Sequence, residues 1–284
     1  AQALVFPLTI IFNSSLQTHS VPLQWKTSII VPIFKKGDKS NPLNYRPVAL
    51  TSSFSRLFES ILHEKISNHL LKFSLISPHQ YGFVKNRFLC DQLLTNIHEW
   101  LTCVFGGSCV NVVYTDIAKD FDTVSHSKLL HILHSFGLSY TLVSWFKSFL
   151  DNRQQCVCIG SSISSFLPVY SGVPQGSVIG PLLFTLYING VTSTVDSLRN
   201  VRGISLFADD AKLFDIDVKS LQSSVINFIS WSRDRQLNIA SHKCYSIQFS
   251  KSHNPPPTFY INNVELEYKP LIRDLGIYIS VDLK

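Results

Sequence analysis

Three aspartates stand directly beside apolar, strand-like segments, and their placement constrains how this chain can fold. Asp116 follows the apolar run of residues 109–115, whereas Asp209 and Asp210 separate two apolar half-strands within residues 203–214. Removing a carboxylate from water is costly unless a cation or hydrogen bonds compensate its charge. A fold that uses these strands must therefore give the three carboxylates a compensating partner or leave them in contact with water.

The chemistry of three neighbouring carboxylates favours a divalent cation. Carboxylate oxygens are ligands for hard ions, so we expect Mg²⁺, with Mn²⁺ as a substitute. Two such ions held about 3.5–4 Å apart activate an attacking oxygen and stabilise a leaving oxygen in phosphoryl transfer. The alternative is that Asp209 and Asp210 form a solvated hairpin turn. For an isolated pair of aspartates that alternative is favoured, so other segments have to decide between the two.

Strand-like and helix-like patterns are mixed along the 284 residues without regular alternation, which favours the α+β class. β-Branched segments predict strands, and apolar residues spaced three and four apart predict helices. The predicted strands comprise residues 27–34, 109–116, 155–159, 203–214 (as a hairpin), 245–249, 258–261 and 276–279. The predicted helices comprise residues 51–73, 127–136, 139–150, 218–231 and a segment opened by Pro181.

Composition excludes some classes of protein and indicates a partner. With 45% hydrophobic residues, the chain is too apolar to be disordered, and no run of 18 apolar residues predicts a membrane span. Six cysteines without a C-x-x-C pair are typical of an intracellular protein, so we expect the nucleus or cytoplasm. The net charge is +6, and residues 1–100 carry ten Lys or Arg against five Asp or Glu. Such a basic region can bind the phosphate groups of a nucleic acid or a nucleotide. The alternative is a solvated surface that only keeps the protein soluble.

Residues 171–184 (SGVPQGSVIGPLLF) combine three glycines and two prolines with an apolar helix start. Glycine here lets a backbone or a ring approach closely, and Gln175 offers a planar amide beside the gap. An ordinary loop followed by a helix is the alternative. The sequence also lacks methionine, from which we expect a segment of a longer polypeptide.

Several motifs together resemble those of reverse transcriptases, in particular those of non-LTR (LINE-like) retrotransposons. The three central motifs are residues 116–126, which begin at Asp116, residues 171–184, and the sequence Phe-Ala-Asp-Asp at 207–210. Further blocks agree in the order of the family and extend the resemblance over nearly the whole chain: residues 25–38, 44–50, 80–83, 237–243 and 275–277.

The resemblance implies the fingers and palm of a right-hand polymerase, with an antiparallel palm sheet backed by helices. Residues 1–108 would be rich in fingers, residues 109–250 would form the palm, and residues 251–284 would end the palm and begin a connection to a thumb. The reaction would be RNA-directed addition of dNTPs to a DNA primer 3′-hydroxyl. The implied partners are an RNA template, a DNA primer, dNTPs and further domains of a polyprotein, such as an endonuclease and a thumb. We expect no association with a membrane.

The resemblance also assigns roles to individual residues. Asp116 and Asp209 would be the main metal ligands, supported by Asp210. Lys243 would protonate the departing pyrophosphate, and its alternative is a surface lysine. The nucleotide-binding set would be Lys35, Lys36 and Arg46 for the triphosphate, Phe121 as the ring that excludes a 2′-hydroxyl, and Gln175 and Gly176 in the loop lining the site.

The chain departs from the family pattern without losing a proposed metal ligand, and these departures leave other interpretations open. One is a catalytically silent nucleic-acid-binding remnant, and another is a structural protein with surface acids. A third is a reverse transcriptase of the group II intron or telomerase type. The departures are Phe207 in place of Tyr, Asp120 in place of a small residue, Phe88-Leu89 in place of Ser-Thr, and Gly190 in place of Asp.

Overall fold

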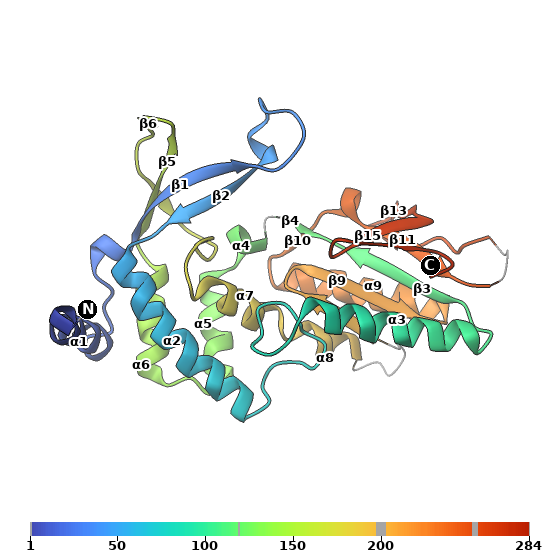
Figure 1. The fold of residues 1–284 in the computed structure, drawn as a ribbon, viewed down its shortest axis with the longest axis horizontal. Helices are drawn as coiled ribbons and strands as arrows, with labels where there is room; N and C mark the ends of the chain where they lie inside the picture. The colour runs from blue at the N-terminus through green and yellow to red at the C-terminus, as the bar shows by residue number, and fades with distance from the viewer. Residues whose placement is uncertain (1, 119, 197–202, 252–254, 284) are drawn as a thin grey trace. The chain divides into compact units, whose positions relative to one another are not determined.

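The chain forms two units, each assembled from segments of both halves of the sequence, and each is described by itself (Figure 1). A computed structural model describes residues 2–118, 120–196, 203–251 and 255–283. Unit 1 comprises residues 1–75 and 121–187, and unit 2 comprises residues 76–120 and 188–284. Helices and strands are mixed in both units, which confirms the α+β class.

Unit 1 combines helices with a mixed sheet of order β2-β1-β5-β6, in which β7 also pairs with β5. β1 and β2 form an antiparallel hairpin, whereas β1 and β5 run parallel. The elements are α1 (Gln2–Gln17), β1 (Thr27–Phe34), β2 (Tyr45–Leu50), α2 (Ser53–Lys72), α4 (Asp120–Thr123), α5 (His126–Ser135), α6 (Tyr140–Leu150), β5 (Arg153–Ile159), β6 (Ser162–Ile163), β7 (Leu167–Val169) and α7 (Gly180–Ile188).

Aromatic side chains form the core of unit 1. Trp145 is fully buried, stacks on Phe149 with ring centroids 5.4 Å apart, and meets the ring of Phe58 edge-on at 5.3 Å. Its indole N–H donates to the Ser15 hydroxyl at 2.9 Å, so its polar atom is satisfied. These contacts join α1, α2 and α6.

Unit 2 is built around a five-stranded sheet of order β14-β11-β3-β9-β8. All neighbouring strands are antiparallel except β11 and β14, which pair in parallel. The elements are α3 (Leu89–Phe105), β3 (Val110–Thr115), β4 (Ile117–Ala118), α8 (Val191–Asp196), β8 (Gly203–Phe207), β9 (Asp210–Asp215), α9 (Val218–Asp234), β10 (Asn238–Ile239), β11 (Tyr245–Phe249), β12 (Tyr260–Ile261), β13 (Val264–Glu265), β14 (Glu267–Tyr268), β15 (Leu271–Asp274) and β16 (Ile277–Ser280).

Helices α3, α8 and α9 pack on the sheet of unit 2. Figure 1 shows α3 in green and α9 in orange beside it. From α3, Trp100 is fully buried, stacks on Phe249 of β11 at 4.8 Å, and meets Phe214 of β9 edge-on at 6.0 Å. Ile272 and Ile279 of the β15–β16 hairpin join the same apolar cluster. The sheet that carries the aspartates is therefore held by a continuous core.

Local sequence signals account for several element ends. The strands predicted at 27–34 and 245–249 form with those bounds, and the hairpin predicted at 203–214 forms as β8 and β9. Ser139 caps α6, because its hydroxyl accepts the Leu142 N–H. The strand predicted at 258–261 is shorter, Tyr260–Ile261. None of the helices in the described ranges is both long and apolar enough to cross a bilayer.

Candidate functional site

The strand register of unit 2 brings Asp116 and Asp210 to the same end of the sheet. β3 and β9 pair antiparallel, with Thr115 opposite Ala211 as the last pair of the ladder. Asp116 follows Thr115 and Asp210 precedes Ala211, so the two aspartates continue the same register. Asp116, which sequence reasoning placed at the end of its strand, thus lies beside the hairpin of the other two acids.

Asp209 lies in the two-residue turn that joins β8 to β9. Phe207 and Asp210 form the last pair of that hairpin, and Ala208 and Asp209 make the turn between them. Ala208 has φ +55°, a left-handed conformation that two-residue hairpin turns need at their first position. The turn therefore presents Asp209 at the same end of the sheet as its two neighbours.

The charges of the three carboxylates interact with one another. The pKa of Asp210 is raised from 3.8 to about 6, first by burial and then by the negative charges of Asp209 and Asp116. The ammonium of Lys212 opposes this rise in pKa but does not cancel it. Asp210 is partly exposed to solvent. The negative charge of the three acids nevertheless exceeds the positive charge that Lys212 supplies. This excess is what a cation would relieve.

Lys243 lies against the same acids. Its Nζ is 3.0 Å from Oδ1 of Asp116, and both side chains are partly exposed. The backbone fixes this neighbourhood, because the Ala240 N–H donates to the Asp116 carbonyl at 2.8 Å and β10 pairs with β4. Sequence reasoning thus selected a lysine that contacts an acid of the trio, and a cation bound by Asp116 would compete with this ion pair.

The three acids supply the oxygen donors that hard divalent cations take, but they do not form a metal cage. Within residues 2–118, 120–196, 203–251 and 255–283, no group of three or more His, Cys, Asp or Glu side chains has the geometry of a metal site. The acids nevertheless offer only oxygen, lie at one sheet end, and repel one another enough to shift a pKa. Those properties suit a hard ion such as Mg²⁺.

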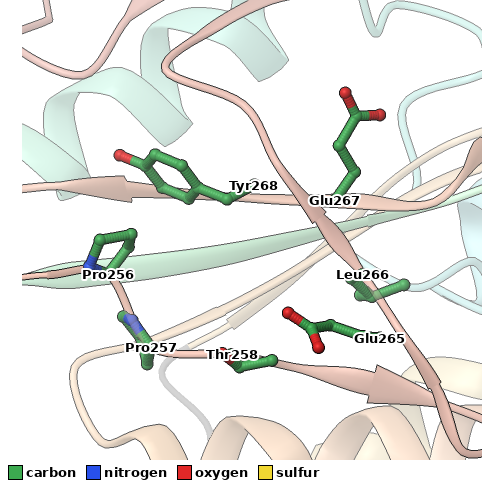
Figure 2. Close-up of a pocket in the computed structure, with 7 residues that line it drawn as sticks. All are labelled: Pro256, Pro257, Thr258, Glu265, Leu266, Glu267 and Tyr268. Atoms are coloured by element: carbon green, nitrogen blue, oxygen red, sulfur yellow. The ribbon is translucent and has the colours of Figure 1, made fainter.

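A pocket of about 170 Å³ opens beside the acids of unit 2. Its lining includes Asp116, Asp210 and Lys243, together with Lys212 and Asp274. A larger pocket of about 510 Å³ lies elsewhere, at β13 and β14, and none of the predicted site residues lines it (Figure 2). Its lining comprises Pro256, Pro257, Thr258, Glu265, Leu266, Glu267 and Tyr268.

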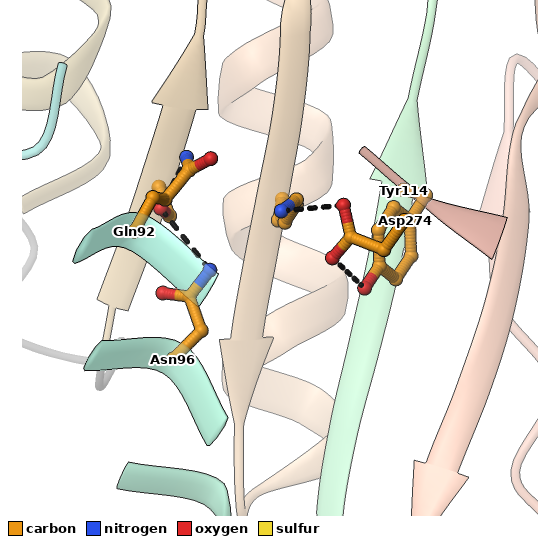
Figure 3. A network of polar contacts seen from close by, with 6 residues as sticks. Gln92, Asn96, Tyr114 and Asp274 are labelled. Carbon is orange, nitrogen blue, oxygen red and sulfur yellow. Dashed lines mark hydrogen bonds and ion pairs between the residues drawn. The ribbon is translucent and has the colours of Figure 1, made fainter. Parts of the chain in front are cut away.

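A buried ion pair between Lys212 and Asp274 lines the smaller pocket, and Figure 3 shows Asp274 beside Tyr114. Lys212 Nζ is 2.7 Å from Oδ1 of Asp274, and the two side chains are 1% and 3% exposed. The Tyr114 hydroxyl donates to Oδ2 of Asp274 at 2.9 Å. Burial lowers the pKa of Lys212, an effect that the Asp274 carboxylate opposes. The pair links β9 to the β15–β16 hairpin.

The predicted triphosphate-binding residues lie on one hairpin of unit 1. Lys35 and Lys36 follow β1, Arg46 lies in β2 opposite Ile33, and all three cationic side chains are exposed. The Lys35 N–H donates to the Asn44 carbonyl at 2.9 Å, which closes the connection between the two strands. The structure thus brings these three cations to one hairpin.

The glycine-rich loop packs against the same hairpin. The Ala49 N–H of β2 donates to the Gln175 carbonyl at 2.6 Å, and the Gln175 amide donates to Oδ1 of Asp122 at 3.2 Å. Gly176 has φ +127°, and a Cβ there would lie 2.3 Å from the Ala49 carbonyl oxygen. Only glycine fits that approach. Phe121 is half-buried and stacks on Phe184 at 4.9 Å.

Sequence reasoning missed Glu59, a fully buried carboxylate of α2 that holds the same loop. Its Oε2 accepts the backbone N–H groups of Val178 at 2.8 Å and Ile179 at 3.2 Å, and its Oε1 accepts the Ser55 hydroxyl at 2.7 Å. The available signal was an acid among the apolar residues of the predicted helix 51–73.

The predicted site residues thus fall into two groups. Asp116, Asp209, Asp210 and Lys243 lie together in unit 2, and the six predicted nucleotide-binding residues lie in unit 1. Lys119, the side chain of Asp120 and the start of the proline-rich stretch at 253–257 lie outside the described residues.

Comparison with known proteins gives consistent matches. The family model described as reverse transcriptase (RNA-dependent DNA polymerase) matches residues 33–263. The chain is 30% identical, over 98% of its length, to a probable RNA-directed DNA polymerase from transposon X-element of Drosophila melanogaster. It is 28% identical, again over 98%, to the RNA-directed DNA polymerase from mobile element jockey of the same species. The chain spans 31% of each of these two relatives.

The match with a solved structure shows only that the two chains share a fold. The structure of apo telomerase from Candida tropicalis, truncated from its C-terminal domain, aligns with a TM-score of 0.66 at 11% sequence identity. The alignment covers 93% of this chain and 55% of that one.

Proposed function

The chain belongs to the reverse transcriptase family, and on that premise we propose that it adds dNTPs to a DNA primer 3′-hydroxyl, copying an RNA template. The RNA-directed DNA polymerases of non-LTR elements among its relatives and the polymerase-like fold confirm the family and the fold that the motifs predicted. The activity is proposed for this chain because it spans only about a third of those relatives. The observation that carries the proposal is the β3–β9 register, which aligns Asp116 with the hairpin of Asp209 and Asp210.

Reverse transcriptases generally depend on a divalent metal, and the acid trio is where this chain would hold it. Asp116 and Asp209 would ligate the ions, with Asp210 in support. The metal, for which we propose Mg²⁺ with Mn²⁺ as a substitute, would neutralise charge on the triphosphate and lower the barrier for attack by the primer oxygen. The register of β3 and β9 and the turn between β8 and β9 support this assignment, because they bring the three carboxylates to one end of the sheet.

The basic and aromatic residues would bind the incoming nucleotide. The guanidinium of Arg46 suits bidentate contact with a phosphate, and the ammonium groups of Lys35 and Lys36 add charge on the same hairpin. Phe121 would exclude a 2′-hydroxyl by steric clash, with Gln175 and Gly176 lining the site. Lys243, already 3.0 Å from Asp116, would donate a proton to the departing pyrophosphate.

The partners and the division into subdomains belong to the same proposal. The template would be RNA and the primer DNA, and an endonuclease and a thumb would lie in the same polyprotein. Residues 1–108 would be rich in fingers, 109–250 would form the palm, and 251–284 would lead towards the thumb. RNA as the template is supported by the relatives that are named RNA-directed DNA polymerases.

Primer extension on an RNA template with Mg²⁺ tests the proposal. We expect measurable dNTP incorporation that Asp209→Asn abolishes. Asp217→Asn is the matched control, because Asp217 caps α9 and asparagine preserves the acceptor for the Ser220 N–H. Extension by the Asp209 variant at the rate of the unmodified chain would refute the role of the trio.

A catalytically silent nucleic-acid-binding remnant is the second candidate function. The exposed cations Lys35, Lys36 and Arg46 on one hairpin of unit 1 favour it, because such a surface binds phosphates whether or not the acids hold a metal. Binding of primer-template without any extension, in Mg²⁺ or in Mn²⁺, would establish this candidate.

A further inference from the structure

Residues 79–82, a segment to which the site described above gives no role, extend the sheet of unit 2 along β8. The Tyr81 N–H donates to the Leu206 carbonyl, and the Leu206 N–H donates to the His79 carbonyl, both at 2.9 Å. These two bonds form a parallel bridge centred on Gln80 and Leu206. The segment therefore lies directly beside the strand that leads into the Asp209 turn.

The side chain of Gln80 reaches that turn. It is fully buried, and its Oε1 accepts two backbone N–H groups, that of Gly82 at 2.8 Å and that of Ala208 at 3.2 Å. Ala208 is buried and has φ +55°. A left-handed conformation is unfavourable for an alanine, so the turn needs contacts that stabilise it. By accepting the Ala208 N–H, Gln80 fixes the peptide group between Phe207 and Ala208, one residue before Asp209.

Gly82 and Arg87 hold Gln80 in this position. A Cβ on Gly82 would lie 2.2 Å from the Ala208 nitrogen and 2.9 Å from the Phe207 carbonyl carbon, so the two backbones touch and only glycine fits. The Arg87 guanidinium donates to the carbonyl oxygens of Ser77 and Gln80. The segment is thus fixed on one side by Arg87 and on the other by β8.

We propose that Gln80 is a positioning residue for the reaction: its amide oxygen holds Ala208 in the left-handed turn and so fixes the direction in which Asp209 is presented. This inference rests on the proposed function, because Asp209 is taken as a metal ligand. Gln80 itself contacts backbone groups and would touch neither substrate nor metal.

The first variant is Gln80→Met, which keeps the length of the side chain and removes the acceptor. A misplaced catalytic group costs roughly tenfold to a hundredfold in rate. We therefore expect kcat for primer extension to fall by about that factor, with KM for primer-template unchanged and more Mg²⁺ needed for half-maximal activity. The chain has few alanines, so selective ¹⁵N-alanine labelling resolves the Ala208 amide, whose hydrogen exchange should become faster.

Gln92→Met is the matched control. Gln92 is also fully buried, and its amide donates to the Ser205 hydroxyl of β8 at 2.7 Å (Figure 3). The substitution removes a buried hydrogen bond to the same strand but none to the turn. We expect it to lower stability as Gln80→Met does, while kcat, the Mg²⁺ requirement and Ala208 exchange stay as in the unmodified chain.

A second pair of variants tests the same contact through the backbone. Gly82→Ala should reproduce the effects of Gln80→Met, whereas Gly190→Ala should not, because the methyl group that it adds would meet its nearest neighbours, Trp231 and Arg235, only at 4.0 Å. Ala208→Gly in the Gln80→Met background should recover part of kcat, since glycine adopts the left-handed turn without the amide bond.

The outcomes separate this inference from the proposed function. If the unmodified chain extends no primer, the proposed function fails, and Ala208 exchange still reports whether Gln80 holds the turn. If Gln80→Met leaves Ala208 exchange unchanged, or lowers kcat no more than Gln92→Met does, the positioning role is wrong even for an active polymerase.

Discussion

The buried ion pair of Lys212 and Asp274 gives the most quantitative prediction. Its atoms are 2.7 Å apart, and the two side chains are 1% and 3% exposed, so neither charge can turn to water when the other is removed. Removing one partner of such a pair typically costs about 3–5 kcal/mol, because a buried charge stays uncompensated. We therefore expect Lys212→Met and Asp274→Leu each to lower the free energy of unfolding by about that amount.

The double variant should be far more stable than the sum of the two losses predicts. With both charges gone, the remaining cost is mainly the Tyr114 hydroxyl, which loses its acceptor on Asp274. An unsatisfied buried donor costs about 1–3 kcal/mol, so the double variant should lose about 2 kcal/mol.

Urea unfolding at pH 7.5, followed by circular dichroism, measures these differences. Lys269→Met is the matched control, because Lys269 pairs with Glu267 at 3.2 Å while 36% and 70% of the two side chains remain exposed. Exposed pairs contribute about 0–1 kcal/mol. A loss for Lys212→Met no larger than that for Lys269→Met would refute the reasoning, and so would additive losses in the double variant.

Three further predictions concern Asp210, the buried Glu59 that holds the glycine-rich loop, and the ring of Phe121. Since the pKa of Asp210 is raised to about 6, its stabilising protonated form is lost as pH rises from about 4 through 6. Asp210→Asn should therefore raise the free energy of unfolding by about 1 kcal/mol at pH 7.5, a value reduced for solvent screening, and should not change it at pH 4. Thermal melts measure the difference, and equal gains at both pH values would contradict this reasoning. Glu59→Gln should lower the free energy of unfolding by about 2 kcal/mol in urea, because a neutral amide oxygen replaces the charged acceptor of two backbone N–H groups. The exposed Glu64→Gln in the same helix should change little. Phe121→Val should raise ribonucleotide incorporation in primer extension, and an unchanged dNTP/rNTP ratio would leave the ring as a packing partner of Phe184.

The sequence predicted the elements that carry the acids, because their signals are local. The segments beside Asp116 and around Asp209 and Asp210 are short and predominantly apolar, and the acids lie at their ends. Those features are enough to predict two strand ends and a hairpin. The motifs then identified the family, which local patterns by themselves do not reveal.

Elements without a local signal were not predicted. Helix α3 begins after Phe88, which is not a usual N-cap residue, and α1 contains Pro7. Strand β2 contains Pro47, which argues against a central strand, yet β2 is the edge of its sheet and pairs Pro47 with Pro32 of β1. In each case tertiary packing decides what the local pattern leaves open.

The supporting residues of the site were missed for a related reason. Glu59 and Gln80 look like ordinary polar residues in the sequence, and each acquires its role from backbone groups more than a hundred positions away. The block at 80–83 was recognised as part of the family resemblance, but the target of the Gln80 amide depends on the register of β8. Spacing along the chain does not contain that register.

The bridge between residues 79–81 and β8 also affects how the protein behaves among its own copies. β8 is the terminal strand of its sheet, and exposed terminal strands invite pairing with strands of other molecules. Here the Leu206 N–H and carbonyl are already engaged by His79 and Tyr81. Residues 79–81 thus shield the Leu206 stretch of β8 from pairing with strands of other molecules. The same few residues that reach the Asp209 turn therefore also protect the chain against aggregation.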